Sequence, residues 1–430
     1  MNRKLLVPGM FIALASLVVG CNEELTQINP SASQNSFVND LSQATNTMNK
    51  SDDDDLKDSY IVVYKQDNLS INALGFDMNA QALSDGVKAD HVYNEAIKGY
   101  AGKISSSTLA KLKKNPNIDY IEKDQVYSIN TLQSPVPTWG IDRIDDSGTT
   151  GLDGKYSYTS TGLGVDAYII DTGILTTHQE FEGRAKSGFT AIGTSSTDQN
   201  GHGTHVAGTV GGKNYGVAKK VNLFAVRVLD ASGSGTASGV IAGINWAINH
   251  HTVNPAVANM SLGGGVSAAL DAAVQSAVAD GIVMCVAAGN DTRDAINYSP
   301  SRVGAAITVG SSGAYPYPSG LYLSGTYNPS INSTFKYDAI SSFSNYGSIV
   351  DIFAPGSGIR SAWYTSSTAT NTISGTSMAT PHVTGVAALY LALNPSKTPA
   401  QVETELKTKA KLKVTGMPAG TTNKLLYASY

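Results

Sequence analysis

The sequence predicts an α/β protein with a doubly wound, mostly parallel sheet and helices on both faces, preceded by a small α+β domain. Two observations predict the main domain. Apolar, β-branched runs alternate with segments of helical spacing from about residue 165 onward. Strands that alternate with helices build a parallel sheet covered on both faces. A third observation predicts the smaller domain, because a separate group of short elements begins at Ser59.

The elements of the main sheet follow in chain order. Three apolar runs are expected to be strands: 165–170, 221–228 and 282–288. Two segments between them have helical spacing: 239–248 and 268–279. A further helix is expected to open within 375–382 and to continue to about Leu393, with Pro381 in its first turn.

The first residues read as an export signal. Arg3 and Lys4 precede an apolar run over 5–19, which is too short to span a bilayer as a helix. Gly20 and Cys21 follow, and a cysteine in this place resembles a bacterial lipoprotein signal, so residues 1–21 predict a signal peptide with lipidation at Cys21. The alternative is an ordinary signal peptide that is cut nearby.

Residues 22–58 are rich in Asn, Ser, Gln and Thr and end in an acidic run, which predicts a disordered tether. Residues 59–130 then form the predicted α+β domain. Its expected elements are a strand at 60–64, a short helix after Ser105–Ser107 that Pro116 stops, and a strand over 118–129. Residues 131–138 read as a linker, and 131–430 is the main domain.

Composition excludes some functions. Only 15% of residues are charged, the net charge is -4 and no Lys/Arg-rich cluster occurs, which argues against a nucleic-acid partner. The chain has two cysteines, so a disulfide framework is not expected. Cys285 is expected to be a buried core thiol.

Four motifs carry the chemistry. Asp171 ends the first expected strand and is followed by Thr-Gly, at the sheet edge where functional groups gather. A turn or capping role is the ordinary reading. An aspartic protease would need a second such motif, and the one at 146–148 is too close in sequence.

His202 lies within the run 200–209 and has His205 three residues later. A zinc pair is one reading, but no His-Glu-x-x-His motif occurs, and His205 is expected to be a packed or hydrogen-bonding residue. Ser377 opens a helix, where a serine is most often an N-cap but becomes a nucleophile if a histidine reaches it. Asn290 follows an expected strand and could donate to an oxyanion.

Taken together, the order Asp, His, Asn, Ser resembles the subtilisin family of serine endopeptidases, most closely its proteinase K branch, over 139–430. The resemblance implies a subtilisin-like fold and the family's Ser-His-Asp mechanism of peptide hydrolysis. Ser377 would attack the scissile carbonyl, His202 would take its proton, and Asp171 would orient the imidazole. Asn290 and the Ser377 N–H would bind the oxyanion.

The resemblance also implies the substrate contacts. Two segments would pair with extended protein or peptide substrates: Gly233, Ser234, Gly235 and Ser261, Leu262, Gly263. The second of these would line the primary specificity pocket together with Ala287, Ala288 and Gly289. These segments hold no acidic residue, so a broad apolar or aromatic preference is expected. Ala237, in place of a frequent tyrosine, predicts a wider distant subsite.

By the same resemblance, residues 59–130 are an inhibitory propeptide that the enzyme itself removes, with the cut between Ile129 and Gln133. The product would be a secreted monomer, and only the lipidated precursor would be held at the cell envelope. The rival function is an inactive, lipid-anchored binding protein on the same scaffold.

Structural calcium is implied as well, and no organic cofactor. The expected first site comprises Asp351 with the carbonyls of Gly304 and Ala306, and the expected second site comprises Asp142, Asp145 and Asp153. Residues 311–340 are longer than this family needs and read as a surface loop or hairpin.

Overall fold

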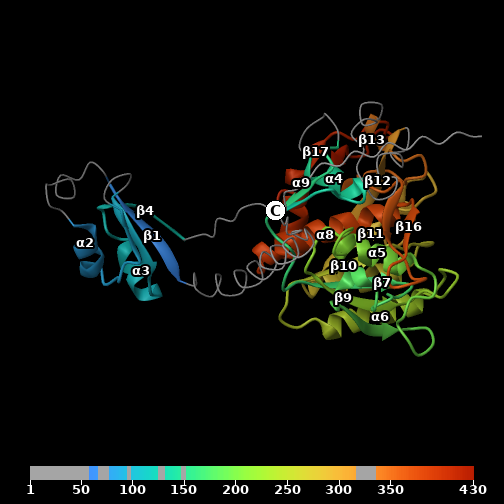
Figure 1. Ribbon diagram of the computed structural model, residues 1–430, viewed down its shortest axis with the longest axis horizontal. Coiled ribbons are helices and arrows are strands. Elements are labelled where there is room, and N and C mark those ends of the chain that lie inside the picture. The colour runs from blue at the N-terminus through green and yellow to red at the C-terminus, as the bar shows by residue number, and fades with distance from the viewer. Residues whose placement is uncertain (1–57, 66–76, 94–97, 124–130, 147–151, 316–335) are drawn as a thin grey trace, which may run out of the picture. The chain divides into compact units, whose positions relative to one another are not determined.

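The computed structural model describes residues 58–65, 77–93, 98–123, 131–146, 152–315 and 336–430. The predicted signal peptide, the tether and Cys21 lie outside these ranges. The chain divides into two compact units between Tyr127 and Ser128, and each has its own sheet and core (Figure 1). No helix within the described ranges is long and apolar enough to cross a membrane.

The smaller unit is an antiparallel sheet with strand order β2-β3-β1-β4 and two short helices. Its elements are β1 Ser59–Tyr64, α2 Met78–Ser84, β2 His91–Tyr93, β3 Gly99–Lys103, α3 Ser106–Leu112 and β4 Ile118–Lys123. α3 begins where the sequence predicts, because the Ser105 hydroxyl accepts from Thr108 N. Val62, Tyr100 and Leu112 meet in one core, so the predicted α+β domain is confirmed.

The larger unit contains a long sheet of order β17-β18-β14-β12-β11-β10-β7-β9-β8, with β13 paired to β12. All neighbouring strands from β8 to β18 in this order are parallel. β13 pairs antiparallel with β12, and β17 pairs antiparallel with β18. The strands are β7 Asp166–Asp171, β8 Ala185–Thr190, β9 Asn222–Arg227, β10 Ala256–Met260, β11 Val283–Ala287, β12 Ile307–Tyr315, β13 Lys336–Ile340, β14 Ile352–Pro355, β17 Lys411–Leu412 and β18 Lys424–Leu425.

Helices cover both faces of this sheet. They are α4 Trp139–Asp145, α5 His202–Gly211, α6 Ala237–His250, α7 Ala268–Ala279, α8 Thr376–Leu393 and α9 Pro399–Lys409, with short 3₁₀ turns at Gln179–Phe181 and Ala295–Asn297. Successive side chains of β7 point to opposite faces, so Ile169 packs in the core formed with α5 and α8, and Ile170 packs in the core formed with α6 and α7. The predicted doubly wound architecture is confirmed.

The strand order reverses beside β7. Strands β9 and β8 lie on one side of β7, and β10, β11 and β12 follow in order on the other. Such a reversal separates the loops that leave the carboxyl ends of neighbouring strands, and ligands bind in the resulting crevice. The loops after β7, β10 and β11 are therefore placed to build a site.

Two connecting segments differ from the expectation. The predicted linker 131–138 begins as a strand, because β5 Thr131–Gln133 pairs antiparallel with β6 Tyr156–Tyr158. Lys219 Nζ also donates to Gln133 Oε1 at 2.6 Å, which ties this strand to the larger unit. The ends of the long segment 311–340 form the antiparallel pair β12–β13, and residues 316–335 lie outside the described ranges.

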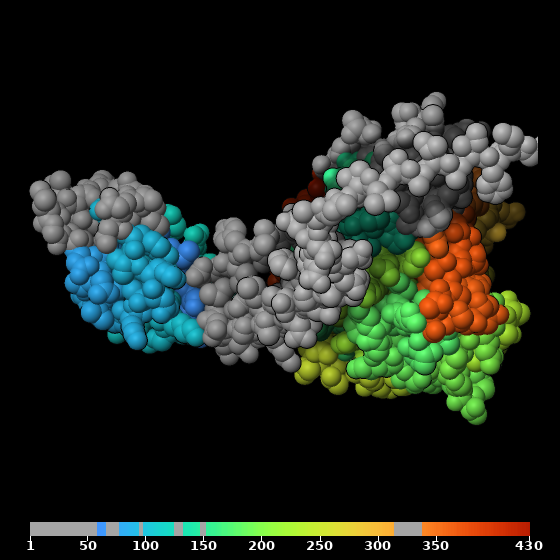
Figure 2. Space-filling view, in the orientation of Figure 1, coloured from blue at the N-terminus to red at the C-terminus, as the bar shows by residue number. Residues whose placement is uncertain are grey.

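A second hairpin, β15 Ile359–Ala362 with β16 Thr370–Ile373, covers one side of the larger unit. Figure 2 shows this orange segment lying against the green surface that precedes α5. Gln179 N donates to Ser367 O at 2.8 Å across this contact.

Candidate active site

Asp171 and His202 form a hydrogen-bonded pair. Asp171 ends β7 and is fully buried, and its Oδ1 accepts from Thr172 N at 2.7 Å. His202 Nδ1 lies 2.8 Å from Asp171 Oδ1 and 3.0 Å from Oδ2. The carboxylate thus holds the Nδ1–H tautomer, which leaves Nε2 as the ring nitrogen able to accept a proton.

His202 is the first residue of α5, after Gly201 with φ +111°. A side chain at position 201 would meet the Trp363 ring at 2.5 Å, so only glycine fits this approach. Burial by itself would lower the pKa of His202, but the charge and hydrogen bond of Asp171 outweigh it and raise the pKa above its ordinary value. The imidazole is therefore a stronger base than a free histidine.

His205 points away from this chemistry. It is fully buried, its Nε2 donates to Ile359 O at 2.9 Å, and burial lowers its pKa to about 3. Among the described residues no group of three or more His, Cys, Asp and Glu side chains is arranged to hold a metal ion. The zinc-pair alternative is wrong, and the expected hydrogen-bonding role of His205 is confirmed.

Ser377 is the second residue of α8 and is joined to Ser261 by two hydrogen bonds. Ser377 Oγ donates to Ser261 O at 3.1 Å, and Ser261 Oγ donates to Ser377 O at 2.8 Å. The Ser377 carbonyl is free for this contact because Pro381, four residues later, has no N–H. Pro381 thus lies inside the helix, and its predicted place in the first turn is wrong.

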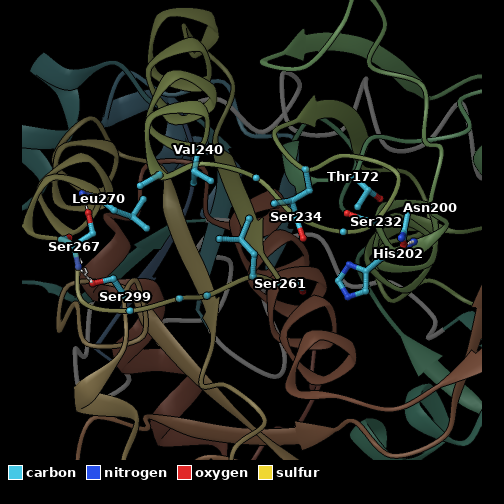
Figure 3. A pocket seen from close by; sticks show the side chains of 18 residues that line it. Thr172, Asn200, His202, Ser232, Ser234, Val240, Ser261, Ser267, Leu270 and Ser299 are labelled. Atoms are coloured by element: carbon cyan, nitrogen blue, oxygen red, sulfur yellow. Dashed lines mark hydrogen bonds between the residues drawn. The ribbon is translucent and has the colours of Figure 1, made fainter.

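The groove beside His202 and the hollow beside Ser377 share residues 261–265 as lining. Ser261, hydrogen-bonded to Ser377, lines the same groove as His202 (Figure 3). In this structure the hydroxyl donates to the Ser261 carbonyl and not to His202. Hydrogen bonds of catalytic groups are often incomplete until a substrate is bound.

Asn290 follows β11 and has a fixed amide orientation. Its Oδ1 accepts from Thr376 N at 2.8 Å and from Thr376 Oγ1 at 3.0 Å. Two donors on the oxygen leave the NH₂ group of Asn290 available, and Asn290 and Ser377 line the same hollow. An oxyanion site requires a donor of this kind near the nucleophile.

A groove of about 680 Å³ runs past His202. In Figure 3, Ser234 and Ser261 lie between His202 on one side and Val240 and Leu270 on the other. The two predicted substrate segments, 233–235 and 261–263, thus line one groove. Ala237 lines the same groove.

A second hollow of about 390 Å³ adjoins Ser377. It is lined by both segments predicted for the primary pocket, 261–263 and 287–289. Asp291 and Tyr298 are among the lining residues that sequence reasoning missed. Asp291 directly follows Asn290, and its position next to a candidate site residue was the sequence signal that could have placed it in the pocket. Its carboxylate adds one acidic group to a pocket expected to have none.

The expected first calcium site already holds a cation from the protein. Asp351 Oδ1 lies 2.7 Å from Lys407 Nζ, and its Oδ2 accepts from Thr308 N at 2.9 Å. The predicted carbonyl ligands, Gly304 and Ala306, lie just before β12. An ammonium at hydrogen-bond distance competes with a metal ion for the same oxygen, so these donors fit calcium only if Lys407 is displaced.

The expected second calcium site is not formed. Both carboxylate oxygens of Asp142 accept backbone N–H groups, from Asp153 at 3.1 Å and from Gly154 at 2.9 Å. Asp145 accepts from Ser157 N at 2.6 Å, and burial raises its pKa to about 7. These carboxylates fold the 152–157 loop onto α4, and the three do not form a metal-holding group.

Cys285 is fully buried, and burial raises the pKa of its thiol to about 12. The expectation of an inert core thiol is confirmed.

Comparison with known proteins gives concordant matches. Residues 164–425 match the subtilase family model, and residues 29–130 match the peptidase inhibitor I9 model. The extracellular serine proteinase of Thermus sp. (strain Rt41A) is 52% identical over 366 residues, which cover 81% of this chain and 83% of that protein. The cuticle-degrading protease of Metarhizium anisopliae is 43% identical over 379 residues, covering 86% and 90%. The crystal structure of a cold adapted subtilisin-like serine proteinase matches with TM-score 0.61 and 51% identity, covering 69% of this chain and 100% of that one.

Proposed function

The chain belongs to the subtilase family and is a serine protease with an I9-type inhibitor domain, and from this premise we propose that it is a secreted endopeptidase with Asp171, His202 and Ser377 as its triad. The observation that carries the proposal is the Asp171–His202 hydrogen bond. His202 lines a groove that Ser261 also lines, and Ser261 is hydrogen-bonded to Ser377. The acyl-enzyme route follows from it.

In that route the Ser377 hydroxyl leaves the Ser261 carbonyl by rotation about χ1 and donates to His202 Nε2. His202 takes the proton as Ser377 Oγ attacks the peptide carbonyl, and the buried Asp171 carboxylate stabilises the imidazolium. The oxyanion accepts from the Asn290 side chain and from the N–H of Ser377, near the positive end of α8. The imidazolium then protonates the leaving amine, and water repeats the sequence to release the acid.

The groove supports an extended substrate strand between 233–235 and 261–263. The hollow beside Ser377 takes the side chain that precedes the cleaved bond. Its lining of Ala288, Leu262 and Tyr298 favours apolar and aromatic residues, and Asp291 adds tolerance for basic ones.

A serine-directed fluorophosphonate probe tests the triad. Wild-type protein should be labelled, and Ser377→Ala should not be. Asp171→Asn should retain the fold but label slowly, because the imidazole loses the partner that holds its tautomer. Absence of labelling in folded, processed wild type would instead favour the rival function, an inactive binding protein.

The precursor is proposed to be cut before Thr131, because β5 is part of the larger unit. The inhibitor domain at 59–130 would occupy its own enzyme until self-cleavage, and the mature domain 131–430 would then be released as a monomer. If Cys21 carries lipid, only the precursor is anchored. N-terminal sequencing of active enzyme from medium and from washed envelopes tests both points.

Calcium would compete with the Lys407 ammonium for the Asp351 carboxylate. Hard oxygen donors of this kind suit calcium when the ammonium has moved away, and the ion would then support stability without entering the reaction.

A further inference from the structure

Asp198 is a buried carboxylate for which the triad mechanism has no role. It lies in the loop before α5 and is 4% exposed. Its Oδ1 accepts from Thr172 Oγ1 at 2.8 Å and from the backbone N–H groups of Asn200 and Gly201, both at 2.9 Å. Its Oδ2 accepts from Thr204 N at 2.9 Å and from Thr204 Oγ1 at 2.6 Å. Five donors converge on one carboxylate, so hydrogen bonds fix the position of both of its oxygens.

These donors come from the two elements that carry Asp171 and His202. Thr172 directly follows Asp171, whereas Gly201 and Thr204 flank the start of α5 on either side of His202. Thr172 Oγ1 also accepts from Gly203 N at 2.9 Å. The end of β7 and the first turn of α5 are thus joined through Asp198 and the Thr172 hydroxyl, in parallel with the Asp171–His202 bond.

The join also satisfies the free N–H groups at the start of α5. The first N–H groups of a helix have no partner within it and carry partial positive charge, which a carboxylate stabilises. The N-cap of α5 is Gly201, which has no side chain to do this. The Asp198 carboxylate, in the preceding loop, accepts from the N–H of Thr204 in the first turn instead. The orientation of the His202 backbone therefore depends on Asp198.

We propose that Asp198 is a positioning residue for the catalytic imidazole, which sets the separation of Asp171 and His202 and adds a second negative charge close to the imidazolium. The proposal rests on the triad proposed above.

The charge has a separate, measurable effect. The ionisable groups that act on His202 include Asp171 on β7, Asp198 in the preceding loop and His205 on α5. The loop that holds Asp198 also accepts hydrogen bonds from Arg227 on β9, at Ser195 O, Thr197 O and Gln199 Oε1. His205 is neutral over the working range because burial lowers its pKa to about 3. Asp198 adds to the effect of Asp171 in raising the pKa of His202, so removal of its charge should move the acid limb of activity to lower pH.

The test is Asp198→Asn in the full chain. The amide keeps the shape but removes the charge and replaces one acceptor by a donor that faces other donors. Misplacement of catalytic groups by about 1 Å can cost on the order of 10²-fold, so we expect kcat to fall roughly 10- to 100-fold. KM should change little, because none of the donors to Asp198 comes from the two proposed substrate segments, 233–235 and 261–263. The acid-limb midpoint of kcat/KM should fall at the same time.

Glu180→Gln is the matched control. Glu180 is also a buried carboxylate, which accepts from Asn214 N at 2.8 Å and from Tyr215 N at 3.2 Å, beyond the other end of α5. A ten-residue helix is about 15 Å long, so this charge is remote from His202. Glu180→Gln should lower the melting temperature but leave the acid-limb midpoint unchanged.

Thr204→Val serves if Asp198→Asn does not fold or mature. It removes one hydroxyl donor and keeps the carboxylate, so kcat should fall several-fold while the pH midpoint stays near that of wild type. The proposal is overturned if folded Asp198→Asn matches wild type in kcat and midpoint, if Glu180→Gln shifts the midpoint equally, or if Thr204→Val leaves kcat unchanged. Failure of the triad itself is separate, because wild type would then not react with fluorophosphonate.

Discussion

Thr376→Val tests whether the orientation of Asn290 is set by its neighbour. Thr376 is fully buried, and its hydroxyl donates to Asn290 Oδ1 at 3.0 Å while it accepts from Gly289 N at 3.2 Å. Valine has nearly the same shape but no hydroxyl. After the change Asn290 Oδ1 keeps only the bond from Thr376 N, at 2.8 Å.

The size of the effect follows from one hydrogen bond. A neutral hydrogen bond contributes a net ~0.5–1.5 kcal/mol, and 1.36 kcal/mol is tenfold in rate. We therefore expect kcat to fall roughly 2- to 13-fold. Removal of the donor itself in Asn290→Ala should cost on the order of 10²–10³, a magnitude measured in a subtilisin. The lost partner of Gly289 N should also reduce the free energy of unfolding by about 1–3 kcal/mol.

The assay compares kcat of Thr376→Val and Thr376→Ser on a chromogenic peptide, with active sites titrated by fluorophosphonate. Serine keeps the hydroxyl and loses only a methyl group, so it should stay close to wild type in kcat. Equal kcat values for the valine and serine variants would refute the orienting role of the hydroxyl. A rise in KM with kcat unchanged would also contradict it, because Asn290 is proposed to act on the transition state.

Three further predictions concern charge. Because Asp171 raises the pKa of His202, kcat/KM should rise with pH through a midpoint above the ordinary histidine value of about 6.5; a midpoint below it in a pH profile would be inconsistent with the pair. Lys407→Met should lower the melting temperature measured in chelator, because Asp351 loses its 2.7 Å partner. Added calcium should then raise the melting temperature of the variant more than that of wild type. Equal calcium-induced shifts in calorimetry would argue against competition between Lys407 and calcium for Asp351. Asp291→Asn should reduce kcat/KM for substrates with Lys before the cleaved bond by roughly two- to fivefold relative to Phe, and less at high salt; an unchanged Lys/Phe ratio would remove Asp291 from the pocket's selectivity.

Much of the fold was predictable because its signals are local. Ser105 caps α3, and the buried apolar positions of α6 and α7 recur at helical spacing, so local pattern locates these helices. The short elements α2, β2 and β3 escaped prediction, since three to seven residues carry too little periodic signal. β5 was missed because it has only three residues and its pairing partner, β6, lies beyond α4 in the chain.

By itself, then, the sequence predicted the alternation of strands and helices and pointed to Asp171, His202, Asn290 and Ser377 as candidates, since each lies in a motif beside its own element. Only the tertiary structure decided how their side chains are used. Lys407 reaches Asp351 across 56 positions, and Asp198 collects donors from two elements. Such contacts depend on which strands become neighbours in the sheet. Spacing along the chain does not give the distance between two side chains that only the packed structure brings together.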